Sequence, residues 1–424
     1  NLKIEEIKYQ INAKISNSSI FNIFQNLDLK KVNLNLTLNP EMLTYFGNAN
    51  LQDTKIIING SEDYNQASEI IFLNFEMGSK DLNIYFDDFV DSFAGSMPTE
   101  IIYKIDKKTN KKKIEGWGLV DNLKIEDNFL GLNFDKKLEG KFDFKLSLDE
   151  NKLENGSFNI NSDILKIEIR KEKQNIDRYD IDIFKTPIQD FSGFIEVGKF
   201  KNIQVFGKMI SLDLLSDDKF FEAKNLNFDF NVKKLFFSDK PILNPILKGN
   251  ILNNEFQNFE FSTTNNEIYH KIKIYDHNNS SNLLVRSNNA SDLLSFFKKE
   301  IKIKNGELII NAKKENQSYL GTLTLTDFIA YDTPIFAKIL SIFSIGGLEQ
   351  KFLDSGIFFK KLDSKYEYYQ NSIFFKEGLV KGSELGLTFN GEANLIDDYY
   401  DIQGTFIPAY TLNTLLTELP IVGD

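Results

Sequence analysis

The sequence predicts a mostly β protein built from many short antiparallel strands. Two observations predict this class: apolar and polar residues alternate along much of the 424-residue chain, and turn-forming residues separate the alternating runs. An alternation with a period of two places apolar side chains on one face of a strand and polar side chains on the other. Strands do not alternate with helices at the spacing of βαβ units, which argues against a doubly wound α/β fold.

Three runs show the alternation most clearly, and they begin at Val32, Phe142 and Leu226. The intervening positions are polar, as at Asn33 and Lys145. A strand of this kind buries one face and exposes the other. The apolar positions of the three runs are therefore the first candidates for contact with an apolar ligand: Val32, Leu34, Leu36, Phe142, Phe144, Leu146, Leu226, Phe228 and Phe230.

Turn signals divide the chain often enough for on the order of thirty strands. The Asn-Gly pairs are the sharpest of these signals, because both residues tolerate the positive φ angles of a tight hairpin. We expect hairpin turns at Asn59-Gly60, Asn155-Gly156, Asn254-Glu255, Asn305-Gly306 and Asn390-Gly391. The basic run 107–113 lies between strand-like segments and contains Asn110, and it predicts another solvated hairpin turn.

The stretch 331–347 is the strongest helical signal. Thr333 is a suitable N-cap, Pro334 suits the first helical position, and a pair of glycines at 346 and 347 ends the run. The helix either packs on a β core or closes one end of an apolar groove. Its candidate groove residues are Ile335, Phe336, Ile339, Leu340 and Phe343. Shorter helices are expected at 289–300, with Asn289 or Ser291 as N-cap, at 410–418, and as one or two turns at 41–46.

One-faced strands can bury their apolar faces in two ways. They can stack as closed sandwiches, or they can continue as one long twisted sheet that curls into a gutter with an apolar floor. The alternation is the same in both arrangements, so it leaves both open.

The residues argue against most kinds of chemistry. The chain has no cysteine and only two histidines, His270 and His277, which lack the spacing of a zinc pair. Each is expected to be a solvated or hydrogen-bonded histidine. No glycine-rich phosphate loop or nucleophile elbow is present, so we expect neither an enzyme nor a bound metal or cofactor. The net charge of −11 without a long basic block argues against nucleic acid as a partner.

No run of apolar residues is long enough for a transmembrane helix. The sequence opens directly in an alternating segment without an initiator methionine. We therefore expect it to be part of a longer chain, whose upstream portion could hold a membrane anchor or a targeting segment.

Three blocks in the last third of the chain carry a family resemblance. The first is D-L-L…F…I-K-N-G-E-L across 292–308, the second is L-T-D-F…Y-D-T-P-I-F-A-K-I-L-S…S-I-G-G-L across 325–348, and the third is G-T-F-I-P-A-Y-T-L-N-T-L-L…L-P-I-V-G-D across 404–424. Together they resemble the C-terminal domain of AsmA-like proteins of the bacterial cell envelope, the group of TamB and YhdP. The resemblance covers 281–424 and divides the chain into a repetitive β region, 1–280, and an AsmA-like C-terminal domain with capping helices, 281–424.

The resemblance implies an open apolar groove: a long, twisted, antiparallel-rich sheet with a few short amphipathic helices near the C-terminus. It implies a periplasmic, bridge-like carrier of phospholipid that is anchored in the inner membrane by an N-terminal helix absent from this sequence and that reaches toward the outer membrane. Its partners would be acyl chains, both membranes and outer-membrane assembly proteins. An elongated β-scaffold for outer-membrane protein assembly is the alternative, and a repetitive surface adhesin is a more distant one.

Overall fold

The computed structural model describes most of the chain. The described residues are 8–24, 27–51, 54–78, 93–121, 123–125, 137–149, 152–173, 177–211, 225–236, 241–253, 255–277, 280–296, 302–331, 356–383, 385–394 and 399–408. Within them the strands are labelled β1 to β27, and one short helix, α2, interrupts them. Twenty-five strands belong to one sheet and two form a small separate sheet. The chain divides into two compact units, Asn1–Leu214 and Leu215–Asp424.

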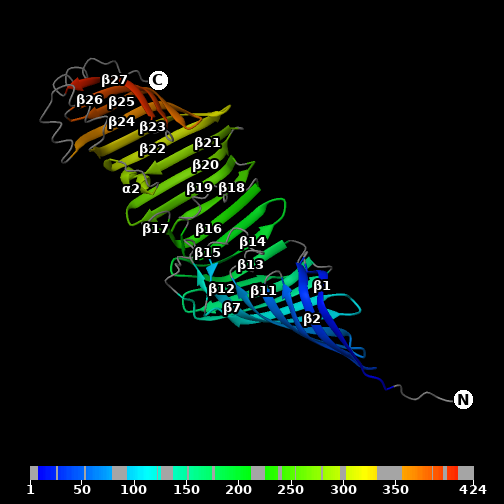
Figure 1. Ribbon diagram of the computed structural model, residues 1–424. Helices are drawn as coiled ribbons and strands as arrows, with labels where there is room; N and C mark the ends of the chain where they lie inside the picture. Colours follow the sequence, from blue (N-terminus) through cyan, green and yellow to red (C-terminus); the bar gives the residue numbers. More distant parts are fainter. Residues whose placement is uncertain are drawn as a thin grey trace. The chain divides into compact units, whose positions relative to one another are not determined.

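In unit 1 each strand of the large sheet pairs antiparallel with its successor along the chain (Figure 1). The small sheet consists of β6 and β9, which pair antiparallel. The strands are β1 (Ile11–Phe24), β2 (Leu27–Leu38), β3 (Met42–Leu51), β4 (Thr54–Asp63), β5 (Ser68–Gly78), β6 (Phe93–Ala94), β7 (Ser96–Asp106), β8 (Lys112–Leu119), β9 (Lys124–Ile125), β10 (Gly140–Asp149), β11 (Lys152–Ser162), β12 (Lys166–Lys171), β13 (Asp177–Lys185), β14 (Asp190–Val197) and β15 (Lys201–Ser211).

Unit 2 repeats the same meander, with a short side strand, β17, beside the end of β16 (Figure 1). Its elements are β16 (Asn225–Phe236), β17 (Pro241–Leu243), β18 (Ile246–Leu252), β19 (Glu255–Asn265), β20 (Ile268–His277), β21 (Ser280–Ser287), α2 (Ala290–Ser295), β22 (Ile303–Glu315), β23 (Ser318–Ala330), β24 (Ile357–Tyr369), β25 (Ser372–Gly382), β26 (Leu385–Asn394) and β27 (Tyr399–Pro408).

The predicted fold class is confirmed. The protein is mostly β, and its main sheet continues from strand to strand as a long antiparallel ribbon that is not closed into a barrel. The predicted division at 280/281 falls between β20 and β21, which pair in register inside unit 2. The division into a β region, 1–280, and an AsmA-like domain, 281–424, stays a prediction.

Most of the predicted Asn-Gly turns are wrong. Asn59-Gly60, Asn155-Gly156 and Asn390-Gly391 lie inside β4, β11 and β26, and the glycine of each pair is paired with both neighbouring strands. Asn305-Gly306 lies inside β22, with φ angles of 59° and 92°, and the register with β23 is the same on both sides of it. These glycines serve the packing of the sheet, which a turn rule based on local conformation does not consider.

Three hairpins instead turn at asparagines with left-handed backbone, and in the β24–β25 hairpin Gln370 shares this conformation with φ of 45°. Asn266, Asn316 and Asn371 have φ angles of 54°, 55° and 66° and lie between paired strands. Asparagine tolerates this region better than other residues with a Cβ. At the turn predicted for Asn254-Glu255, β18 and β19 form a hairpin in which Glu255 already lies in the strand opposite Leu252, and Asn254 lies outside the described residues. The basic run 107–113 is confirmed as the β7–β8 hairpin.

The helix expected at 41–46 is wrong, because β3 begins at Met42. Thr44, Tyr45 and Phe46 are β-branched or aromatic residues, which favour strands, and they pair with both neighbouring strands. The helix expected at 289–300 is confirmed at its start, where Asn289 caps α2 by accepting a hydrogen bond from the amide of Asp292. The helices expected at 333–345 and 410–418 lie outside the described residues.

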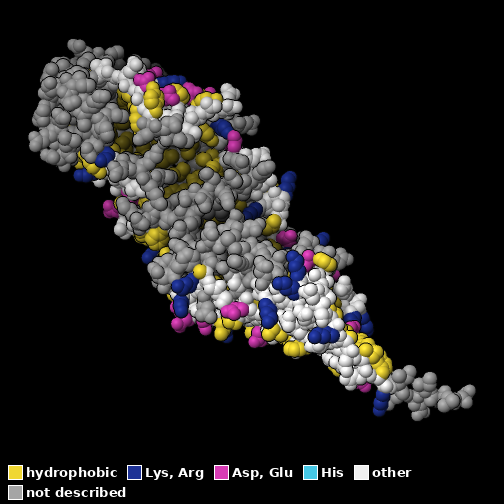
Figure 2. All heavy atoms as spheres, in the orientation of Figure 1, with side chains coloured by type: hydrophobic (Ala, Val, Ile, Leu, Met, Phe, Trp, Pro, Cys, Tyr) yellow, Lys and Arg dark blue, Asp and Glu magenta, His cyan; other side chains and the backbone are white. Residues whose placement is uncertain are grey.

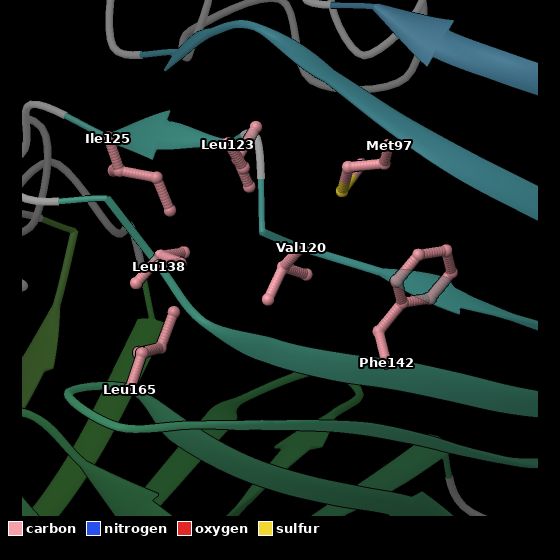
Figure 3. Close-up of a cluster of buried hydrophobic side chains, with 7 residues drawn as sticks. All are labelled: Met97, Val120, Leu123, Ile125, Leu138, Phe142 and Leu165. Atoms are coloured by element: carbon pink, nitrogen blue, oxygen red, sulfur yellow. The ribbon is translucent and has the colours of Figure 1, made fainter.

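Two clusters of buried side chains stabilise unit 1. One gathers on β2, β3 and β4 around Val32 and Ile56. The other joins the large sheet to the small one, where Met97, Val120 and Phe142 face Leu138 and side chains from the β9 segment (Figure 3). Burying an aliphatic side chain of this size contributes about 1.5–3 kcal/mol. The small sheet therefore closes over one part of the apolar face of unit 1.

Candidate functional site

A continuous apolar row crosses unit 1 from strand to strand. Directly opposed residues of antiparallel strands point to the same face, so the pairing register identifies every member. The row contains three glycines and ten apolar side chains and not one polar side chain. We call it the unit 1 row: Ile15, Leu34, Gly47, Ile58, Leu73, Ile101, Gly116, Phe144, Phe158, Ile169, Ile181, Gly193 and Val205.

Unit 2 carries an equivalent row on one face of its sheet, and the hydroxyl of Tyr366 is its only polar side-chain group. Figure 2 shows hydrophobic side chains gathered in a recess over the middle strands of this unit. The unit 2 row consists of Phe228, Gly249, Phe259, Ile274, Leu283, Ala312, Gly321, Tyr366, Phe375, Gly391 and Ile402.

The rows keep part of their apolar surface accessible. Phe158, in the middle of the unit 1 row, is 37% exposed, and Ile402 in the unit 2 row is exposed to the same extent. Leu73, Ile169 and Ile274 are only partly buried. In a closed sandwich the middle of such a row would be packed to the density of a protein interior. The arrangement is that of a floor on which an apolar molecule can lie.

The opposite face of unit 2 is charged. One row there reads Asp229, Lys248, Glu260 and Lys273 across β16, β18, β19 and β20, so opposite charges face one another. Lys248 and Lys271 both form ion pairs with Glu260, at 3.6 and 3.4 Å. Both cations lower the pKa of the Glu260 carboxyl against the opposing effect of its burial. The strands β16, β18, β19 and β20 thus have a charged face on the side opposite to the unit 2 row.

Glycines in the rows accommodate large rings from the neighbouring strand. A Cβ added to Gly116 would lie 2.3 Å from the ring of Phe144, and one added to Gly249 would lie 2.9 Å from the ring of Phe228. Each pair is directly opposed across two strands. Because the ring occupies the volume of the missing side chain, the apolar face stays smooth at these positions.

The structure places the predicted strand residues on the apolar faces and leaves the helical set outside its description. Leu34, Phe144 and Phe228 are members of the rows, and Phe142 belongs to the cluster that contacts the small sheet. Among the strand residues, Val32, Leu34, Phe142, Leu226, Phe228 and Phe230 are buried, and Leu36, Phe144 and Leu146 are partly buried. The helical residues Ile335, Phe336, Ile339, Leu340 and Phe343 lie outside the described residues.

Helix α2 covers one end of the inner face of β20 and β21, and a buried histidine fastens it. His270 Nε2 lies 3.0 Å from Asp292 Oδ2, and His270 Nδ1 lies 2.8 Å from Ser287 Oγ. An ionised carboxylate can only accept, so Nε2 donates to Asp292, and in the neutral imidazole Nδ1 then accepts from the serine hydroxyl. The ring of Phe296 meets the imidazole edge-on, with 5.5 Å between ring centroids. The expectation of a hydrogen-bonded histidine is confirmed for His270.

The Ser287–His270–Asp292 arrangement has the distances of a catalytic triad but not its accessibility. Ser287 has no exposed surface and His270 is 2% exposed. The Ser287 hydroxyl oxygen also accepts a hydrogen bond from the amide of Asn289 at 3.0 Å. Asp292 lies on the covering helix itself, so movement of α2 away from the serine would remove the residue that orients the imidazole. We assign the cluster to the attachment of α2.

The sequence reasoning missed this cluster and the glycine–ring pairs. His270 and Asp292 are 22 residues apart, and only the hairpin register of β20 and β21 brings the histidine to Ser287. The alternation from Tyr269 to Ile274 was a usable signal, because it places His270 on the same face as Ile272 and Ile274. A histidine on an apolar face needs a partner, and the capped helix just after β21 supplies one.

In the described part of the chain no cluster of histidine, cysteine and carboxylate side chains is suited to hold a metal ion. None of the helices in the described ranges has the length and apolar character needed to cross a bilayer.

The fold and the rows define a class: a long, mostly antiparallel β-sheet with an unbroken apolar row on one face of each unit. Comparison of the chain with known protein families, with curated proteins and with solved structures gave no match.

Proposed function

We propose that this protein is a non-enzymatic carrier that shields the acyl chains of phospholipids on its apolar faces. The unit 1 row is the observation that carries the proposal, because thirteen consecutive members present no polar side chain while Phe158 stays accessible. Acyl chains need non-directional apolar contact and no hydrogen-bond partner, which such a floor supplies along its length.

The proposed setting follows from the AsmA-like resemblance of 281–424. The chain would act in the periplasm of a bacterial cell envelope, tethered to the inner membrane by an N-terminal helix outside this sequence, and pass phospholipid toward the outer membrane. The described strands support this role because their two faces differ: a lipid can lie on the apolar row while the charged row on the opposite face contacts water.

The test is lipid loading, with two neighbouring variants. The protein is purified in mild detergent, and bound phospholipid is counted by native mass spectrometry. Phe158→Glu places a charge on the apolar row, whereas Ser157→Glu places it on the opposite face beside Lys145 and Arg170. We expect several lipids per chain in the wild type and in Ser157→Glu, and a clear loss in Phe158→Glu. An absence of lipid in the wild type, or equal loading of both variants, would overturn the proposal.

The alternative role, an elongated scaffold for outer-membrane protein assembly, is favoured by an aromatic patch on the other face of unit 1. Phe46 is 58% exposed and opposes Asn59, which separates it from Phe72, 43% exposed, and Ile102 continues the row on β7. Exposed aromatic side chains close together on one face are typical of protein contacts. Cross-linking from position 46 distinguishes the two roles, because a scaffold would give a protein adduct there while a carrier would not require one.

A further inference from the structure

A hollow of about 460 Å³ lies at one edge of unit 2, beside the apolar row. Three hairpin ends meet there: β18–β19, β20–β21 and β22–β23. The side chains that matter below are Glu255, Phe256, Asp276, Ser281 and Lys314, all of which line the hollow.

The hollow continues the apolar row into a polar rim. In the β20–β21 hairpin Asp276 opposes Ser281. Two residues further along the strands, away from the edge, Ile274 opposes Leu283. Because side chains two residues apart share a face, the rim pair lies on the same side as the row. Phe256 lines the hollow, and its ring meets that of Phe259, a row member, with 5.2 Å between centroids. An amphipathic molecule could therefore leave its apolar part on the row and its polar part in the hollow.

The charges of the hollow are mixed. Lys314 Nζ lies 2.9 Å from Glu255 Oε2, an ion pair that joins β22 to the start of β19. The hydrogen bond from Lys314 to Glu255 raises the pKa of the lysine, so its ammonium is retained. Asp276 adds a second carboxylate at the rim. One ammonium and two carboxylates give a formal charge of −1, counted with a neutral His277, which also lines the hollow.

Ser281 provides an independent sign of a ligand. Its Oγ is shielded from solvent and has no hydrogen-bond partner among the described residues. A shielded hydroxyl without a partner destabilises the fold, so buried hydroxyls are almost always paired. Ser281 lines the hollow next to Lys314, where an acceptor oxygen would satisfy it.

We propose that this rim hollow receives the headgroup of a zwitterionic phospholipid that carries a phosphate and a primary ammonium group. Lys314 and the hydroxyl of Ser281 donate to the phosphate, and Asp276 and Glu255 accept from the ammonium. The acyl chains pass over Phe256 and Phe259 onto the unit 2 row. This inference rests on the proposed carrier function and names the lipid class that it would select.

The same groups disfavour the other common headgroups. An anionic glycerol headgroup has no cation to offer the two carboxylates, and the negative charge of the hollow repels it. A trimethylammonium headgroup has the charge but no N–H, so it cannot donate to Asp276 or Glu255. Selection therefore depends on the pairing of both charges at once.

The test loads the full chain from vesicles that contain phosphatidylethanolamine, phosphatidylglycerol and phosphatidylcholine in equal amounts. Native mass spectrometry then counts each bound lipid. We expect enrichment of phosphatidylethanolamine in the wild type. Asp276→Asn and Lys314→Gln each remove one charge partner, and we expect the enrichment of phosphatidylethanolamine to fall by up to about tenfold.

Lys313→Gln is the matched control, because Lys313 lies on the opposite face of β22 and pairs with Glu315 at 3.4 Å. It should keep the wild-type enrichment. Loading of all three lipids in vesicle proportions would overturn the inference and leave the carrier function standing, and so would equal behaviour of Lys314→Gln and Lys313→Gln. A wild-type chain that loads no lipid would overturn both.

Discussion

The ring of Phe389 lies directly over Gly378, its partner on the adjacent strand. A Cβ at this glycine would fall 2.5 Å from two ring carbons, closer than any non-bonded contact allows. Tyr45 covers Gly60 in the same way in unit 1. Glycine weakens an isolated strand, because it adds no packing and loses more conformational freedom on folding. Here the opposing ring restores the packing and leaves the apolar face even.

Adding a methyl group at these glycines should destabilise the protein. For Gly378→Ala we expect a loss of about 1–3 kcal/mol, because Phe389 must leave its position or the strands must separate. Urea denaturation measures the change. Gly198→Ala is the control, since its added Cβ meets nothing closer than 3.7 Å and its cost should stay within about 0.5 kcal/mol. Equal stability of the two variants would show that the ring moves without cost.

Replacing His270 should loosen α2 without unfolding unit 2. His270→Phe leaves the Ser287 hydroxyl without its acceptor and Asp292 without its donor, which costs about 1–3 kcal/mol. Hydrogen exchange of the amides of 290–296 should accelerate by the corresponding factor. The exposed His277 serves as control, and His277→Gln should leave that exchange unchanged. Full protection of α2 in His270→Phe would contradict the role assigned to the cluster.

Alkaline pH should destabilise unit 2 through Tyr366. Burial raises the pKa of this phenol from 10.0 to about 12. The folded state therefore holds its proton in a range where the unfolded chain releases it, so stability is complete below pH 10 and declines as pH rises toward 12. Tyr366→Phe should show a smaller decline over that interval in denaturation midpoints. Identical profiles for the two proteins would mean that the phenol titrates normally.

Acidic pH should reduce the stability of unit 1 by protonating Asp182. The guanidinium of Arg170 donates to this carboxylate from two nitrogens and lowers the pKa of Asp182 below 3.8. The stabilisation is present above that value and is lost as pH falls through the lowered pKa. Because both side chains are largely accessible, Asp182→Asn should cost less than about 1 kcal/mol at pH 7. It should also flatten the acid limb of the stability profile, and a larger loss at pH 7 would contradict this account.

Many residues of the apolar rows could be predicted from the sequence, because alternation shows which side chains share a strand face. Leu34, Phe144 and Phe228 were selected as apolar positions of alternating runs, and each is a member of a row. The hairpin turns were less accessible. Asn155-Gly156 satisfies a local turn rule, yet its glycine is required for close packing against Leu146 and the carbonyl of Lys145. A tight turn and a close approach between two strands both favour glycine. The sequence alone therefore does not show which of the two an Asn-Gly pair serves.

Alternation along the chain predicts most strands and the apolar side of each one, because a period of two is a property of consecutive residues. Which strands are neighbours and which residues oppose one another follows only from the register of the folded sheet. Register joins residues far apart in the chain, and a shift by one position would exchange the two faces. That register aligns the apolar positions into unbroken rows, brings Lys314 to Glu255, and sets His270 between Ser287 and Asp292.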